Sequence, residues 1–113
     1  MEIEGTTNFR DHVDLMVLES PAALVLDWWR RLDLTLVDCF GPDAPDDRAS
    51  LEQRIREDAR FGEAVARRVE LLRKRRNEVA HESVYLPREE AVAFAEDAFD
   101  LIGVFGQWAS DAA

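Results

Sequence analysis

The residues best suited to chemistry lie in one stretch, residues 73–81, with the sequence RKRRNEVAH. The stretch joins a cluster of cations to His81, one of only two histidines in the chain. Asn77 and His81 are four residues apart, so they share one face if the stretch is helical. An asparagine and a histidine near a helix end are more often capping or surface groups than a site. The pair therefore carries weight only together with its neighbours.

The apolar face of the predicted helix contains an arginine. Residues 61–82 place four apolar side chains on one face: Val65, Val69, Leu72 and Val79. Arg76 fills a gap in that face, where it needs a partner, a cavity or an interface. It either snorkels or pairs with an acid across the bundle, or it faces a cleft and binds an anion. Arg76 and His81 lie about 140° apart on a helix, so they converge only if the helix loosens near Ala80 or a second subunit closes the site.

Periodicity and capping signals predict the helices that must hold this stretch. Ser20 and Pro21 form a cap and first-turn pair for a helix that runs to about Phe40. Ser50 starts the next helix, with Gln53 completing a capping box. The predicted helices cover residues 9–19, 20–40, 50–62, 62–82 and 87 onward. Residues 83–86 are predicted to connect the last two helices.

No segment shows a sustained strand pattern, so the predicted fold is all-α. We expect an antiparallel helical bundle of four main helices plus a short N-terminal helix, in one domain over residues 1–113. Residues 1–8 are expected to be flexible and residues 41–49 to form a loop. Trp28 and Trp29 are interpreted as core or subunit interface rather than as a platform for stacking bases. The last helix is apolar over about half its circumference, which indicates a second neighbour such as another subunit.

Composition limits the function classes. The formal net charge of -10 argues against general nucleic-acid coating, although a local phosphate site stays open. Cys39 is the only cysteine, which excludes an internal disulfide and a zinc-type cysteine spacing. No metal, no cofactor and no membrane span are predicted, and a reduced cytoplasmic setting is expected.

The hexapeptide RNEVAH at residues 76–81 is similar to the signature of the HEPN superfamily, an arginine and a histidine separated by four to six residues. It matches the common Arg-Asn-x-x-Ala-His form. The order of elements also resembles that family: a long helix ending in the motif, a short connection and a final amphipathic helix. Residues 18–24, LESPAAL, followed by a long helix with Trp29, look like the first helix of several bacterial HEPN-like families. The resemblance covers roughly residues 18–109.

The resemblance implies a homodimer whose two motif helices line one cleft, and metal-independent RNA cleavage that leaves a 2′,3′-cyclic phosphate and a 5′-hydroxyl. His81 would move a proton at the ribose 2′-hydroxyl or the leaving oxygen. Arg76 would stabilise the scissile phosphate, and Asn77 would orient the histidine or the phosphate. Contacts to the RNA backbone would come from three neighbouring cations: Arg73, Lys74 and Arg75. Alternatively, these three are solvated cations favoured near a helix C-terminus.

Three functions remain open. The first is a HEPN-type endoribonuclease, as a toxin or phage-defence component with a cognate protein partner or antitoxin. The second is a non-catalytic HEPN-like dimer that acts as an adaptor or regulatory subunit. The third is an acidic antitoxin or inhibitor, which the even spread of acids through the helices disfavours.

One departure from the family pattern limits the resemblance. In toxins of HEPN toxin–antitoxin pairs a tyrosine usually stands two residues after the histidine, where this chain has Ser83. Tyr85 lies four residues after His81, which puts neutralisation by tyrosine modification in doubt. The second histidine, His12, is expected to be exposed and is assigned no role.

Overall fold

The computed structural model describes residues 9–15, 20–41, 47–81 and 85–112. These ranges contain a short helix at residues 9–15 and four main helices: α2 (Pro21–Phe40), α3 (Arg48–Glu57), α4 (Gly62–His81) and α5 (Arg88–Ala112). No described residue lies in a strand, so the all-α bundle with a short N-terminal helix is confirmed. The expectations for residues 1–8, for 16–19 and for most of the 41–49 loop lie outside the described residues.

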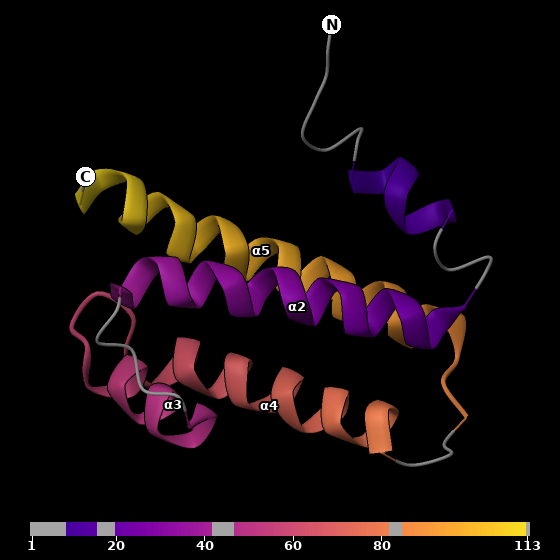
Figure 1. Ribbon diagram of the computed structural model, residues 1–113, viewed down its shortest axis with the longest axis horizontal. Helices are drawn as coiled ribbons and strands as arrows, with labels where there is room; N and C mark the ends of the chain where they lie inside the picture. Colours follow the sequence, from indigo (N-terminus) through magenta and orange to yellow (C-terminus); the bar gives the residue numbers. More distant parts are fainter. Residues whose placement is uncertain (1–8, 16–19, 42–46, 82–84, 113) are drawn as a thin grey trace, which may run out of the picture.

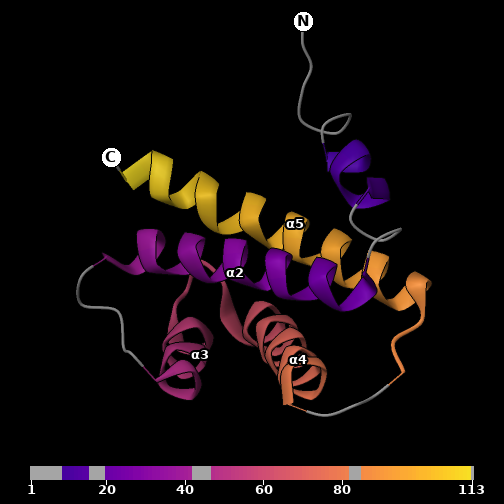
Figure 2. The ribbon, with the colours of Figure 1, turned by 45° about the vertical axis from the view of Figure 1, so that its right-hand side comes forward.

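The four main helices form two pairs. Helices α2 and α5 lie side by side, and α3 and α4 form a second layer against them (Figure 1, Figure 2). Helix α2 packs most extensively on α5 and also contacts α4, whereas α3 packs on α4. Helix α4 runs opposite to α2 and α5, which run in the same direction (Figure 1). Helix α4, which holds the predicted motif, therefore runs antiparallel to both α2 and α5.

Helix α2 begins and ends where local chemistry requires it. The hydroxyl of Ser20 accepts a hydrogen bond from the backbone N–H of Ala23 at 3.1 Å, and Pro21 occupies the first turn. The helix ends at Gly41, whose φ of 75° lies in the left-handed region that glycine adopts without a steric cost. The predicted range of this helix is confirmed.

The predicted start of α3 is wrong. Helix α3 begins at Arg48, and its N-cap is Asp47, whose carboxylate accepts from the backbone N–H of Ser50 at 3.0 Å. Ser50 is the third residue of the helix rather than its cap, and its hydroxyl donates to the same carboxylate at 2.9 Å. Gln53 therefore completes no capping box and instead donates to Glu57 at 2.7 Å. The charged acceptor displaces the hydroxyl as cap because it satisfies two donors at once.

The other boundaries shift by a few residues. Helix α3 ends at Glu57 rather than near residue 61, because Asp58 turns the chain by accepting from the Arg60 backbone N–H at 2.8 Å. Helix α4 spans Gly62–His81, and the predicted last residue, Glu82, lies outside the described residues. Helix α5 starts one residue after Pro87, whose carbonyl accepts from the backbone N–H groups of Glu90 and Ala91, each at 3.1 Å.

The core lies mainly between α2 and α5. Its largest fully buried side chains include Leu24, Leu32, Leu36, Leu101 and Phe105. Trp28 and Trp29 are only 6% and 7% exposed, which confirms that both belong to the core. Phe99 on α5 remains 38% exposed, so part of the wide apolar face of this helix is uncovered in the single chain.

The short N-terminal helix is fastened to this core through an aromatic cluster. The ring of Phe9 stacks on Phe99 at 4.3 Å and meets Trp28 edge-on at 5.0 Å. His12, expected to be exposed, is half-buried, and its Nε2 lies 3.1 Å from the carboxylate of Asp27. His12 therefore helps hold the short helix on α2. Its contact joins residues fifteen positions apart, which the sequence pattern does not reveal.

Candidate functional site

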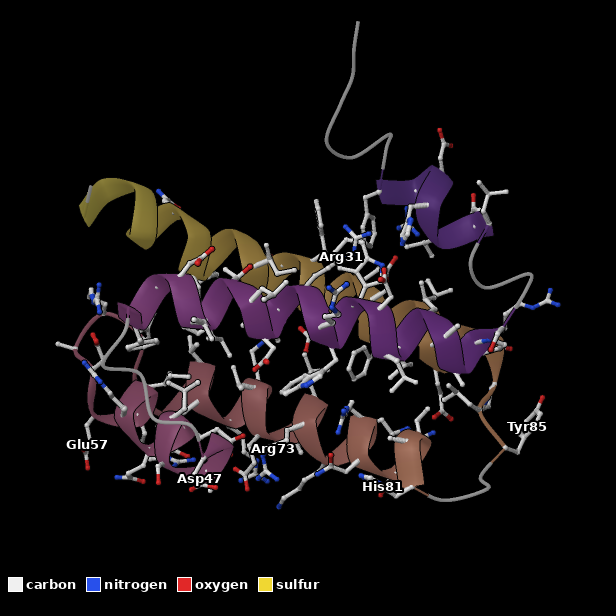
Figure 3. All side chains as sticks on the ribbon, in the orientation of Figure 1. Arg31, Asp47, Glu57, Arg73, His81 and Tyr85 are labelled. Carbon is white, nitrogen blue, oxygen red and sulfur yellow. The ribbon has the colours of Figure 1, made fainter. Side chains whose placement is uncertain are left out.

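The stretch at residues 73–81 forms the C-terminal half of α4, and the helix continues unbroken through Ala80 to His81 (Figure 3). The loosening that would have brought Arg76 toward His81 within one chain is absent from this helix. The two side chains therefore leave α4 about 140° apart. Closure by a second subunit, the other route considered above, stays a prediction.

Arg76 lies on the buried side of α4, as its place in the apolar pattern predicts. Val69 and Leu72, which precede it on that face, are 1% and 7% exposed. Arg76 itself is half-buried, and its Nε is buried without a hydrogen-bond partner in the described part of the chain. Arg76 also makes no ion pair with any described carboxylate, so pairing with an acid across the bundle, one of the alternatives for this residue, is not found. A buried guanidinium N–H without an acceptor costs free energy of folding.

Asn77 contacts Arg76 directly. The Arg76 Nη1 donates to the Oδ1 of Asn77 at 3.0 Å. Asn77 is half-buried, and no hydrogen bond joins it to His81 within the residues described. The structure thus brings together the arginine and the asparagine of the motif, and it leaves the histidine apart from them.

His81 is the last residue of α4 and is exposed (Figure 3). No described side chain donates a hydrogen bond to its ring or accepts one from it. An exposed histidine at a helix end is open to a ligand or to another protein chain.

Arg73 forms an ion pair with a buried carboxylate. Its guanidinium donates to both carboxylate oxygens of Glu52 on α3, from Nε at 2.5 Å and from Nη2 at 3.1 Å. Glu52 is only 4% exposed, and it is the buried charged residue of the described core. The hydrogen bonds from this pair raise the pKa of Arg73 above its ordinary value. Arg73 therefore joins α3 to α4, a role that sequence reasoning missed because the partner lies on another helix.

The other two cations predicted to contact RNA are also paired. Lys74 lies 3.0 Å from Glu70 one turn earlier on α4. Arg75 pairs with Glu78 at 2.9 Å and also with Glu90 on α5, so it bridges two helices. The hydrogen bonds that Arg75 donates to Glu78 and Glu90 raise the pKa of Arg75. RNA phosphates would have to replace carboxylates at all three cations, and their RNA contact stays a prediction.

Among the described residues, the other reactive groups form no second site. The described residues contain no group of three or more side chains suited to hold a metal ion. Burial raises the pKa of the Cys39 thiol, which disfavours the nucleophilic thiolate. None of the described helices is long and apolar enough to cross a membrane.

No protein-family model matches the chain, and comparisons with curated proteins and with solved structures also give no match.

Proposed function

We propose that the chain is a HEPN-type, metal-independent endoribonuclease that acts as a homodimer, in a toxin or phage-defence setting. Arg76 binds the scissile phosphate, Asn77 holds the guanidinium in position, and His81 carries the proton. His81 takes the proton of the ribose 2′-hydroxyl, the 2′-oxygen bonds to phosphorus, and the bond to the 5′-oxygen breaks. A proton returns to the 5′-oxygen, so the products are a 2′,3′-cyclic phosphate and a 5′-hydroxyl.

One observation carries the proposal: Arg76 is half-buried on the apolar face, and its Nε has no acceptor among the described residues. Polar groups left unsatisfied in a folded protein are concentrated where a ligand or a mechanism uses them. An arginine whose fork is only partly engaged, here by Asn77 at 3.0 Å, retains donors for a phosphate. The motif resemblance supplies the reaction class.

The test is cleavage of a labelled single-stranded RNA of mixed sequence by purified protein with EDTA present. We expect cleavage by the wild type and at least about a 100-fold loss in His81→Ala, since general acid–base catalysis contributes at least that much. Arg76→Ala should lose activity similarly because the oxyanion is left without its donor. Arg30→Ala serves as the matched control, because Arg30 is an exposed arginine on α2. Equal trace activity in wild type and both motif variants would refute the proposal.

The His81→Ala variant distinguishes a loss of catalysis from a failure to fold. This residue is exposed at the end of α4, so His81→Ala should keep the helical content and the urea midpoint of the wild type. The identity of the product ends gives a second readout. A cyclic phosphate end supports the mechanism, and a 3′-hydroxyl end contradicts it.

A second function, a non-catalytic HEPN-like dimeric adaptor or regulatory subunit, is favoured by a different observation. Each of the three cations expected to hold RNA is already paired with a carboxylate, and Arg73 is bound to buried Glu52. A surface neutralised in this way attracts RNA weakly. Binding of RNA at physiological salt by the His81→Ala variant, measured by filter binding, discriminates the two: binding supports the nuclease, and its absence supports the adaptor.

A further inference from the structure

The short N-terminal helix packs on a surface that α2 and α5 form together, which we call the acceptor patch. The patch consists of Asp27 and Trp28 of α2 and of Glu96 and Phe99 of α5, each of which contacts the short helix. It lies on the side of α2 and α5 that faces away from α3 and α4 (Figure 1, Figure 2). The short helix is therefore an addition to one face of the bundle rather than a part of its two layers.

The short helix binds this patch through apolar anchors at helical spacing. Phe9 is 7% exposed and Val13 is fully buried, whereas Leu15 is 68% exposed. Phe9 and Val13 are four residues apart, so they share one face of the helix. Amphipathic helices that dock on a partner protein use anchors with this spacing. Residues 9–15 therefore present to the patch the kind of face that a bound peptide helix presents.

Two polar contacts flank the anchors. Arg10 donates to the Glu96 carboxylate at 2.6 Å, and Nε2 of His12 lies 3.1 Å from the Asp27 carboxylate. Arg31 of α2 donates to the same Asp27 oxygen at 2.9 Å, so that acid keeps a partner without the short helix. Glu96 has no ion-pair partner other than Arg10 in the described ranges. Both side chains of the Arg10–Glu96 pair are about half exposed, and such pairs stabilise a contact only slightly.

The contact also leaves a buried polar atom unsatisfied. Trp28 is 6% exposed, and its ring contacts the rings of Phe9, His12 and Phe99. The Nε1 of Trp28 is buried and has no hydrogen-bond partner in the described part of the chain. A buried indole N–H usually finds an acceptor, and leaving it unpaired costs free energy. The chain's own helix is therefore an imperfect occupant of the acceptor patch.

The length of the short helix points the same way. Seven residues make about two helical turns, and isolated helices shorter than about 12 residues are marginal in water. Residues 9–15 are therefore helical because they are docked. Their covalent link to α2 raises their effective concentration at the patch, so docking requires only a low intrinsic affinity. A separate helix with better contacts can compete with them.

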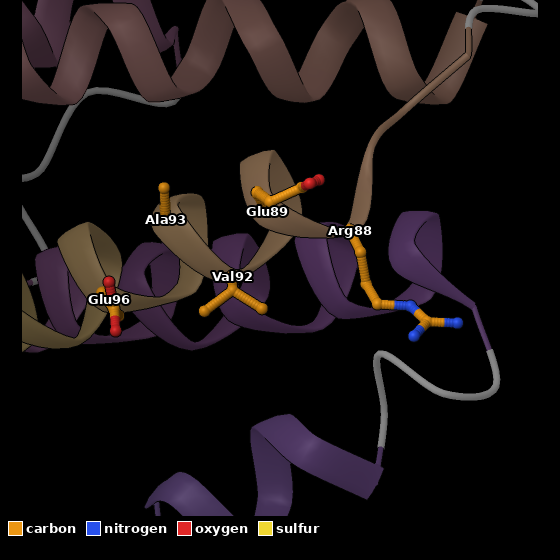
Figure 4. Close-up of a pocket in the computed structure, with 5 residues that line it drawn as sticks. All are labelled: Arg88, Glu89, Val92, Ala93 and Glu96. Carbon is orange, nitrogen blue, oxygen red and sulfur yellow. The ribbon is translucent and has the colours of Figure 1, made fainter.

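The surface beside the patch has room for a longer helix. A shallow depression continues along α5 from Glu96 over Val92 to Arg88 (Figure 4). Val92 is half-buried and gives this depression an apolar centre. A helix that docks beside Glu96 and extends over the depression would bury more apolar surface than residues 9–15 do.

We propose that the acceptor patch binds an amphipathic helix of a partner protein, and that residues 9–15 occupy the patch as an internal competitor. The partner helix has an aromatic anchor, a cation in the next position, and an aliphatic anchor four positions after the aromatic one. It also supplies an oxygen acceptor to the Nε1 of Trp28. The inference does not rest on the proposed function, since the acceptor patch contains no residue of α4.

The test is binding of a labelled peptide with the sequence of residues 5–19 to the full chain, measured by fluorescence anisotropy. One host is the wild type, and the second host carries Phe9→Ala and Val13→Ala, which frees the patch. We expect the peptide to bind the second host at least about tenfold more tightly, because the wild-type helix competes at high effective concentration. A peptide with Phe9→Ala should bind neither host.

A charge exchange locates the bound peptide. Glu96→Arg in the second host should weaken binding about fivefold, because it faces Arg10 of the peptide, and a peptide with Arg10→Glu should recover that loss. Glu57→Arg is the matched control, since Glu57 is an exposed glutamate on α3, and it should leave binding unchanged. Circular dichroism checks that the second host is folded. The full chain with Arg10→Glu alone keeps both anchors and serves as a third host, which should bind the peptide more tightly than the wild type does.

The chemistry of the partner is tested with a library of randomised helical peptides displayed on phage and selected against the second host. We expect enrichment of an aromatic residue, a cation next to it and an aliphatic residue four positions after the aromatic one. Titration of an enriched peptide into the isotope-labelled host should shift the indole N–H resonance of Trp28 downfield, as a new acceptor requires.

Several results would overturn the proposal. Equal binding of the peptide to wild type and second host, or binding that survives Phe9→Ala in the peptide, would place the peptide elsewhere. Enriched sequences without the expected pattern would exclude the stated partner. A wild-type dimer that Phe9→Ala dissociates, measured by sedimentation equilibrium, would assign the acceptor patch to a second copy of this chain.

Discussion

Glu52 of α3 is buried, and both of its carboxylate oxygens accept hydrogen bonds from Arg73 of α4. Arg73 belongs to the motif stretch, and Glu52 belongs to the short helix α3, which packs mainly on α4. The pair therefore connects the placement of α3 to the helix that bears the candidate site. A buried charge pair of this kind specifies geometry more than it adds stability, because both ions lose their hydration.

The first prediction concerns this pair. Arg73→Ala leaves the Glu52 carboxylate buried without a partner and should lower the free energy of unfolding by about 3 kcal/mol. Adding Glu52→Met should recover most of that loss, because the unpaired charge is removed. Urea denaturation of both single variants and the double variant measures the coupling. If the double variant is as unstable as Arg73→Ala, the carboxylate is not the source of the loss.

The second prediction separates stability from activity at Arg76. Arg76→Met places an apolar side chain on the face formed by Val69 and Leu72 and removes a buried, unsatisfied N–H. The free energy of unfolding should rise by about 1 kcal/mol while RNA cleavage is lost. Arg67→Met is the matched control, since Arg67 is exposed, and it should change stability by less than about 0.5 kcal/mol. A clear loss of stability in Arg76→Met would show that the arginine is needed for folding instead.

The third prediction concerns pH. Hydrogen bonds from the Ser50 hydroxyl and backbone lower the pKa of Asp47 below its unfolded value of 3.8. A carboxyl group whose pKa is lower in the folded state stabilises the fold above its unfolded pKa. That stabilisation is lost as the pH falls through the folded pKa.

Asp47→Asn keeps an oxygen acceptor at the cap but removes the titration. The difference in urea midpoint between wild type and Asp47→Asn should be constant from about pH 7 to pH 5 and should shrink below about pH 4. A difference that persists unchanged to about pH 2 would show that the charge of Asp47 does not contribute to the cap.

The fourth prediction concerns the short N-terminal helix. Phe9→Ala removes the ring that stacks on Phe99 and meets Trp28, and it should lower the free energy of unfolding by about 2 kcal/mol. Leu15→Ala on the same helix is the control, because Leu15 is 68% exposed. Urea denaturation followed by tryptophan fluorescence measures both variants. Equal midpoints for the two would mean that residues 9–15 contribute little to the stability of the fold.

The helices were predictable where one local signal was dominant. The pair Ser20-Pro21 fixed the start of α2, because the hydroxyl cap and the proline favour the same first turn. The start of α3 was not predictable in this way, since Asp47 and Ser50 are both good caps. Only the geometry shows that the Asp47 carboxylate accepts from the Ser50 backbone and hydroxyl together.

In the candidate site, too, the sequence predicted which face of the helix a residue occupies, but it did not predict contacts with other helices. The helical projection placed Arg76 on the buried face, and the structure agrees. The partners of Arg73 and Arg75 lie on α3 and α5, twenty-one and fifteen residues away, and no periodicity within α4 reports them. Their pairing depends on tertiary packing, which sequence spacing along one helix does not encode.

The parallel course of α2 and α5 has a consequence for the order of folding. Their contacts join residues far apart in sequence, such as Phe40 and Phe105, whereas α3 and α4 are neighbours along the chain. Local contacts form faster than distant ones because less loop entropy is lost. During synthesis, the α3–α4 hairpin can therefore assemble while Trp28 of α2 still lacks its α5 neighbour Phe99. The part of α2 that packs on α5 is covered only when α5 leaves the ribosome, so a stalled chain would present that surface to chaperones.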